Sequence, residues 1–239
     1  MTKPLFFDDA YMRDADARVF AITDEGGIIL DASIFYPTSG GQPGDSGTLT
    51  WQGGAIHIAT AVKGASGTII LIPAEPNPLP AVGAIVQQSL NWERRHRHMR
   101  VHTALHLLSA VIPHPVTGGS ISLEKGRLDF DMPDAIANMA IIENSLNKLI
   151  NCDFDIGAEW IDKSQLAANI KLVKTMLVAP LKGAGRIRIV SIGAGKNIAD
   201  YQLCGGTHVR TTSEIGQVRL GKVEKKDNRN RSVYLHLNI

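Results

Sequence analysis

The segment CGGTH at residues 204–208 places a thiol and an imidazole four residues apart. Cysteine thiolates and histidine nitrogens are both good ligands for transition metals, and for Zn²⁺ in particular. Two glycines, Gly205 and Gly206, lie between Cys204 and His208. One pair of ligands does not fix a metal ion, so the rest of such a site has to come from elsewhere in the chain.

The segment VHTALHLL supplies the best second pair. His102 and His106 are four residues apart, and in a helix residues i and i+4 lie on the same face, one turn apart. Three imidazoles and one thiolate are a ligand set that suits a tetrahedral Zn²⁺. The sequence therefore predicts one zinc ion per chain, held by His102, His106, Cys204 and His208.

Each pair alone also occurs in proteins that bind no metal, and the prediction depends on their combination. The remaining histidines offer no competing set. Two-residue spacing turns His96 and His98 to different faces of a helix, so we expect both to be solvated. The others are isolated in the sequence: His57, His114 and His236.

The residues around the ligands bear on whether such a zinc is structural or catalytic. Four protein ligands are typical of a structural zinc, whereas a catalytic zinc keeps one position open for water or substrate. Gly205 and Gly206 favour the catalytic role, because they remove side chains beside the metal and leave backbone N–H groups free to approach a ligand. The alternative is that they only form a turn. A metalloprotease of the H-E-x-x-H type is excluded, since Thr103 stands where the general-base glutamate would be.

The elements that position these residues can be read from hydrophobic spacing. Apolar residues recur at helical intervals over residues 92–112, and Pro113 and Pro115 end that helix. A second apolar stripe predicts a helix over 133–151, with Pro133 in its first turn. A short helix is expected around 163–170.

The first ninety residues are typical of a β-domain and contain little that indicates a helix. Short apolar runs alternate there with glycine-rich turns. We expect strands within residues 26–36, 54–62, 67–74 and 84–92. Further strands are expected in the second half of the chain, over 185–193 and 232–239.

Composition limits the class of protein. A chain of 239 residues, 44% of them hydrophobic, can form one or two domains. Two cysteines cannot make a disulfide framework, and no apolar run approaches the ~20 residues that span a bilayer. Four aspartates near the N-terminus interrupt any signal-peptide pattern. We therefore expect a cytoplasmic protein without a membrane partner.

Four separated blocks resemble, in order, the editing domain of alanyl-tRNA synthetase and its freestanding relatives, the alanyl-tRNA editing (AlaX) proteins. FYPTSGGQPGDSG at 35–47 resembles the family's glycine-rich motif, and MRVHTALHLL resembles its zinc helix. GSISLEKGRLDF resembles the strand region that follows, and ADYQLCGGTHVRTTSEIG resembles the closing metal segment. The resemblance runs from about residue 30 to the end of the chain.

The resemblance implies an α+β protein, with a β-barrel-like domain over 1–90 followed by a zinc-containing editing domain over 91–239, of the threonyl/alanyl-tRNA synthetase type. It implies trans-editing: a hydrolase that deacylates tRNA for alanine wrongly charged with serine or with glycine. Zinc can polarise water or a carbonyl, or bind the substrate's amine or hydroxyl. No obligate protein partner is expected.

Carried over residue by residue, the resemblance makes His102, His106, Cys204 and His208 the metal ligands. Thr103 in the zinc helix and Ser120 in GGSIS are candidates to hydrogen-bond the serine hydroxyl, which alanine lacks. Gln42, in the glycine-rich loop, is a further candidate. We expect the set that contacts the aminoacyl group to be Thr103, Ser120, Gln42, Gly205 and Gly206.

Contacts to the tRNA backbone should be electrostatic in large part, because phosphate neutralisation supplies much of the affinity for nucleic acids. A formal net charge of only +2 means that such contacts must come from local clusters. Two clusters stand out, one at the start of the zinc helix and one near the C-terminus. We expect tRNA contacts from Arg94, Arg95, Arg97, Arg100, Lys222, Lys225 and Lys226.

Two other functions are compatible with the same residues. A zinc-stabilised RNA-binding module would keep the ligands and the cationic clusters but would not deacylate tRNA. A zinc hydrolase of small esters would cleave substrates that lack tRNA. Both remain alternatives to the editing hydrolase at this point.

Overall fold

The computed structural model describes residues 1–134, 136, 138–162 and 186–238. The chain forms two compact units, Met1–Arg97 and His98–Ile239, and the division falls within a single helix, α1 (Trp92–Val111). The expected short helix around 163–170 lies outside the described residues. Among those residues, no helix combines the length and the apolar composition needed to cross a bilayer.

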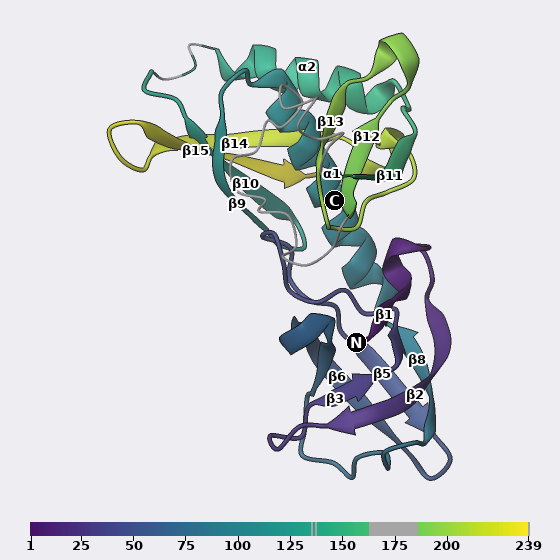
Figure 1. The fold of residues 1–239 in the computed structure, drawn as a ribbon. Helices are drawn as coiled ribbons and strands as arrows, with labels where there is room; N and C mark the ends of the chain where they lie inside the picture. Colours follow the sequence, from purple (N-terminus) through teal and green to yellow (C-terminus); the bar gives the residue numbers. More distant parts are fainter. Residues whose placement is uncertain (135, 137, 163–185, 239) are drawn as a thin grey trace. The chain divides into compact units, whose positions relative to one another are not determined.

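The first unit contains a β-barrel, which is closed by the pairing of its last strand, β8, with its first, β2 (Figure 1). Its side chains alternate between solvent and the interior, as half-buried strands do; in β6, for example, Ile56 and Ile58 point inward. A small parallel pair, β1 (Lys3–Pro4) with β4 (Ala32–Ser33), accompanies the barrel. In barrel order the strands are β2 (Asp14–Ile22), β3 (Ile28–Leu30), β7 (Ile69–Pro73), β6 (Gly54–Lys63), β5 (Gly47–Trp51) and β8 (Ile85–Leu90).

The second unit contains two antiparallel sheets. The four-stranded sheet has the order β14 (Val218–Lys225), β15 (Asn230–Leu237), β10 (Lys125–Asp131) and β9 (Val116–Ile121), so β9 is an edge strand. The three-stranded sheet has the order β11 (Ile156–Asp162), β12 (Arg186–Ile192) and β13 (Asp200–Leu203). Every strand expected from the sequence contains or overlaps an observed strand.

Helix α1 is buried on all sides over residues 101–109. It packs closely on β10: a Cβ atom at Gly126 would lie 2.8 Å from Val101 Cγ1 and 2.9 Å from Leu105 Cδ1. The absence of a side chain at Gly126 therefore allows this close approach of helix and strand. The prediction of His98 as solvated is wrong, since it is 1% exposed; the helix continues into the core at that point.

Helix α2 runs from Met139 to Asn151, so the predicted start at Pro133 is wrong. Asn138 caps the helix instead, and its side chain accepts hydrogen bonds from the N–H groups of Ala140 and Ile141. The helix lies against β14, where Asn147 bonds both the N–H and the C=O of Val218.

Candidate metal centre

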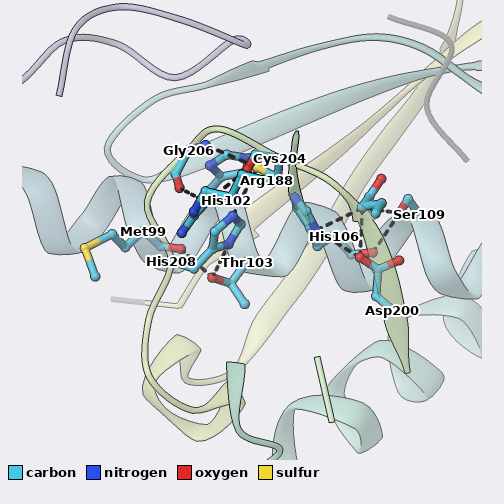
Figure 2. A network of polar contacts seen from close by, with 11 residues as sticks. Met99, His102, Thr103, His106, Ser109, Arg188, Asp200, Cys204, Gly206 and His208 are labelled. Atoms are coloured by element: carbon cyan, nitrogen blue, oxygen red, sulfur yellow. Dashed lines mark hydrogen bonds and ion pairs between the residues drawn. The ribbon is translucent and has the colours of Figure 1, made fainter. Parts of the chain in front are cut away.

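Three imidazoles and one thiol converge at the middle of α1 (Figure 2). His102 and His106 come from consecutive turns of α1, and Cys204 and His208 come from the loop after β13. One ligand atom from each residue lies within 4.8 Å of the others, and all four side chains are buried. The two pairs that the sequence singled out are therefore brought together, in a cluster that can hold one metal ion.

The chemistry of this donor set fits a thiolate-binding metal. Burial alone would raise the pKa of the Cys204 thiol, but the surrounding imidazoles of His102, His208 and His106 hold that pKa well below its usual range. Cys204 Sγ lies 3.5 Å from His102 Nε2 and 3.2 Å from His208 Nε2. A thiolate facing imidazole nitrogens is the form of cysteine that binds metals.

Two histidines of the cluster, His106 and His208, have pKa values that are shifted in opposite directions. Burial and the neighbouring His102 lower the pKa of His208 to about 3, which keeps that ring neutral. Burial would also lower the pKa of His106, but the Cys204 thiolate and Asp200 outweigh it and raise the pKa to about 10. His106 Nδ1 lies 2.9 Å from Asp200 Oδ2, a carboxylate that is itself buried. Sequence reasoning missed Asp200, although an acidic residue four positions before a candidate ligand was a visible signal.

Hydrogen bonds to Arg188 of β12 hold the loop that carries Cys204 in place. The N–H of Cys204 donates to the backbone oxygen of Arg188 (3.2 Å), and Arg188 Nη1 donates to the carbonyls of Cys204 (2.9 Å) and Gly206 (3.0 Å). Gly206 is buried and its N–H donates to Cys204 Sγ (3.3 Å). The expectation of a free Gly206 N–H facing a ligand is therefore wrong, because the thiol occupies it. Arg188 had no distinguishing signal in the sequence.

Thr103 forms hydrogen bonds inside the protein, next to the metal cluster. Its side chain is fully buried, donates to Met99 O (2.9 Å) and lies 3.1 Å from His208 Nδ1. It also accepts from the N–H of Val209 (3.3 Å). The hydroxyl of Thr103 is thus already engaged within the protein, and its contact with a substrate stays a prediction.

Comparison with known proteins places the chain in a family. Residues 187–234 match the family model "Threonyl and Alanyl tRNA synthetase second additional domain", and residues 10–94 match "tRNA synthetases class II (A)". The chain is 34% identical to "Alanyl-tRNA editing protein AlaX-M" of Methanosarcina barkeri and 32% identical to that of Methanosarcina acetivorans, with 99% of each chain covered in both cases. This chain belongs to the alanyl-tRNA editing protein family.

The AlaX-M relatives match along their whole length, and longer proteins match in part. The chain is 33% identical to "Alanine--tRNA ligase" of Pyrobaculum neutrophilum over 94% of its own residues. It spans only 25% of that ligase. The region that the second-additional-domain model matches contains Cys204 and His208, as well as Arg188 and Asp200.

The remaining predicted contacts of the aminoacyl group lie in different settings. Gly205 is exposed, and a Cβ atom added there would meet no atom of the described residues within 4 Å. Ser120 is exposed on the edge strand β9, opposite Arg127 of β10. Gln42 is buried in the first unit, where its N–H donates to Ser39 O. These three remain predictions.

The prediction that Arg95 contacts tRNA is wrong. Its side chain is completely buried and forms an ion pair with the equally buried Asp45. It also donates to the backbone oxygens of Ala10 (2.9 Å) and Ile34 (2.6 Å). A guanidinium bonded in this way inside the first unit is unavailable to a phosphate. The pairing could not be predicted, because Asp45 lies fifty positions earlier in the chain.

The other predicted cations are at least partly exposed, and several have partners. Arg97 pairs with Glu93 (2.8 Å), and Arg100 donates to Ile215 O through Nε (3.0 Å) and Nη2 (2.7 Å). Among the lysines of β14 and the turn that follows, Lys222 pairs with Glu224 and Lys226 with Asp129, whereas Lys225 is exposed. Together with Arg94, these residues remain predicted tRNA contacts.

Proposed function

We propose that this protein is a trans-editing hydrolase that removes serine, and also glycine, from tRNA for alanine. The observation that carries the proposal is the convergence of His102, His106, Cys204 and His208 into one buried cluster. Membership of the alanyl-tRNA editing family over the whole chain supports it. The cytoplasm, where tRNA is charged, is the compartment in which such an enzyme would act.

The proposed cofactor is one Zn²⁺ held by those four residues. When bound, zinc would supply a Lewis acid that polarises water or a carbonyl, or a binding point for the substrate's amine or hydroxyl. The chain's own contribution is to hold the ligands rigidly. Arg188 fixes the Cys204 loop through two carbonyl oxygens, and the N–H of Gly206 stabilises charge on the thiol.

Gly205 is the part of the centre that we propose meets the aminoacyl ester. It is exposed next to a ligand, its φ lies outside the positive range, and nothing in the described part of the chain occupies the space beside it. Neither strain nor packing in that part of the chain requires glycine here. A close approach by the terminal ribose and its ester gives a reason for the missing side chain.

Selection of serine over alanine requires a polar group that binds the hydroxyl. With the hydroxyl of Thr103 engaged internally, the proposed candidates are Ser120 and Gln42. The partly exposed cations Arg94, Arg97, Arg100, Lys222, Lys225 and Lys226 are proposed to contact tRNA phosphates. We also propose that residues 91–239 act as the editing domain and that residues 1–90 form a separate domain carrying the glycine-rich motif.

The proposal is tested by incubating the purified protein with tRNA for alanine charged with serine, glycine or alanine. Seryl-tRNA for serine is the control for tRNA choice, and a seryl ester of adenosine is the control for dependence on tRNA. We expect serine and glycine to be lost from tRNA for alanine, and the correctly charged species to be spared. Loss from none of the charged tRNAs would favour a non-catalytic RNA-binding module. Equal cleavage of the small ester would favour a hydrolase of small esters.

A further inference from the structure

Two of the clustered histidines turn their outer nitrogens toward buried acceptors. His208 Nδ1 lies 3.1 Å from Thr103 Oγ1, and His106 Nδ1 lies 2.9 Å from Asp200 Oδ2. Thr103 is 0% exposed and Asp200 is 2% exposed. In Figure 2 both partners lie outside the cluster, on the far side of the ring from the thiol in the case of Asp200.

The contacts of Thr103 decide which atom carries the proton. A hydroxyl has one proton and two acceptor lone pairs. The proton goes to Met99 O (2.9 Å), because a carbonyl cannot donate, and one lone pair takes the N–H of Val209 (3.3 Å). The remaining lone pair faces His208 Nδ1, which must then be the donor. A proton on Nδ1 leaves Nε2 of His208 free as a lone pair, on the side where Cys204 Sγ lies 3.2 Å away.

Asp200 has the same effect on His106 as Thr103 has on His208: it accepts a hydrogen bond from Nδ1. Here the acceptor is a charged carboxylate and not a neutral hydroxyl. Gln202 Nε2 lies 2.8 Å from Asp200 Oδ2 and donates to it, which anchors the carboxylate from a second direction. Gln202 Nε2 also lies 2.9 Å from His106 Nδ1, but a charged carboxylate can only accept, so the contact between His106 Nδ1 and Asp200 Oδ2 (2.9 Å) requires the proton on Nδ1. The two amide protons of Gln202 are then directed at Asp200 Oδ2 and at Ser109 Oγ (3.4 Å). A carboxylate that accepts from the outer nitrogen of a histidine fixes its tautomer and makes the inner nitrogen a stronger metal ligand.

We propose that Thr103 and Asp200 are positioning residues that keep the protons of His208 and His106 on Nδ1 and so present Nε2 of both rings to the metal. The inference rests on the metal centre of the proposed function but is independent of which ester the protein hydrolyses. It replaces the serine contact expected for Thr103 with a role in metal binding.

Thr103→Val tests the neutral partner, because valine keeps the shape and removes the acceptor. We expect zinc affinity, measured by competition with a chromophoric chelator, to fall about 10- to 100-fold. Thr103→Ser restores a hydroxyl and should restore the affinity. The matched control is Thr212→Val: Thr212 is also a fully buried threonine whose hydroxyl donates to a backbone oxygen (Ile150 O, 3.0 Å) and accepts from a backbone N–H (Phe154, 3.0 Å), and it lies outside the metal cluster. Equal losses in Thr103→Val and Thr212→Val, or no rescue by serine, would overturn the inference.

Asp200→Asn tests the charged partner, because asparagine keeps an acceptor and removes the charge. We expect a loss of zinc affinity of about tenfold or more and a shift of the absorption bands of the Co²⁺-substituted protein, since His106 becomes a weaker ligand. Wild-type affinity together with an unchanged Co²⁺ spectrum would count against a role for the carboxylate.

The zinc-loaded wild-type protein offers a measurement that does not depend on the folding of any variant. Long-range ¹H–¹⁵N correlation spectra distinguish the two histidine tautomers, and we expect the proton of both His106 and His208 on Nδ1. A proton on Nε2 of either ring overturns the inference for that ring. Tautomers as expected in a protein that deacylates nothing would refute the proposed function alone. A wild-type protein that binds no zinc would refute the metal centre itself.

Discussion

Gly205 differs from the other residues of the CGGTH segment in being exposed, whereas Cys204, Gly206, Thr207 and His208 are buried. The buried residues are occupied with each other and with Arg188, so substitutions among them disturb the cluster directly. A Cβ atom at Gly205 would contact none of the residues that the structure describes. Substitutions at Gly205 can therefore test contact with a substrate without disturbing the packing of the fold.

Gly205→Ala and Gly205→Val should leave the melting temperature and the zinc content unchanged and should lower deacylation of seryl-tRNA for alanine, with valine more harmful than alanine. The reason is that a growing side chain excludes the ester from the ligand loop. Zinc content and thermal unfolding of the same preparations serve as the internal control. Full activity in Gly205→Val would show that the substrate does not approach this residue.

At the scale of elements, the start of α1 is anchored within the first unit by Arg95. The guanidinium donates to Asp45 and to two backbone oxygens, and Asp45 in turn accepts from the N–H of Tyr36 (2.6 Å). Removing one partner of a buried ion pair leaves an uncompensated charge. The family's glycine-rich motif, at 35–47, contains Asp45 and is therefore tied to the helix by this pair.

Arg95→Ala should accordingly lower the free energy of unfolding by about 3–5 kcal/mol, measured by chemical denaturation. Arg94→Ala, one position earlier and partly exposed, is the matched control and should change it by less than about 0.5 kcal/mol. Similar small effects for both variants would contradict the buried-pair interpretation.

The four-stranded sheet contains another buried carboxylate, that of Asp129 of β10. It accepts from Ser232 Oγ (2.6 Å) and Lys226 Nζ (2.9 Å). Burial opposes ionisation, but these hydrogen bonds and the nearby Arg127 outweigh it and lower the pKa of Asp129. A carboxyl whose pKa is lower in the folded protein stabilises the fold above its unfolded pKa, and this contribution is lost as pH falls through the folded value.

Asp129→Asn should therefore lower the free energy of unfolding at pH 7, by about 1–3 kcal/mol, and the difference from the wild type should shrink as the pH falls below about 4. Denaturation curves at pH 7 and pH 3 measure it. Asp131→Asn on the same strand is the control: its pair with Arg229 is at the surface (2.9 Å) and should contribute less than about 1 kcal/mol. A difference that does not depend on pH would contradict this account of Asp129.

Local patterns predicted much of this architecture. The helix expected over 92–112 is observed as Trp92–Val111, and the i, i+4 spacing of His102 and His106 placed two ligands on one face. Contacts between residues that are distant in sequence could not be predicted. The hydrogen bond between Thr103 and His208 joins residues 105 positions apart, and the burial of Arg95 depends on Asp45. The start of α2 differs from the prediction for a local reason, because the side chain of Asn138 caps the helix at a later position than Pro133.

At the scale of the whole molecule, the balance of charge bears on how tRNA would be bound. Lysine and arginine total 25 and aspartate and glutamate total 23. Several cations near the C-terminus are paired with carboxylates, for example Lys226 with Asp129 and Arg229 with Asp131. We therefore expect modest long-range attraction for tRNA and a larger share of short-range contacts in the affinity.

The metal cluster is the proposed centre of activity, and the two cysteines of the chain allow a direct test. Cys204 is a buried ligand candidate, whereas Cys152 is exposed at the end of α2. Zinc content and the rate of seryl-tRNA deacylation are measured on the same preparations of the wild type, Cys152→Ala and Cys204→Ala. We expect the wild type and Cys152→Ala to carry about one zinc per chain and to deacylate seryl-tRNA for alanine at equal rates, and Cys204→Ala to lose both zinc and activity. A fully active, folded Cys204→Ala protein would contradict the account.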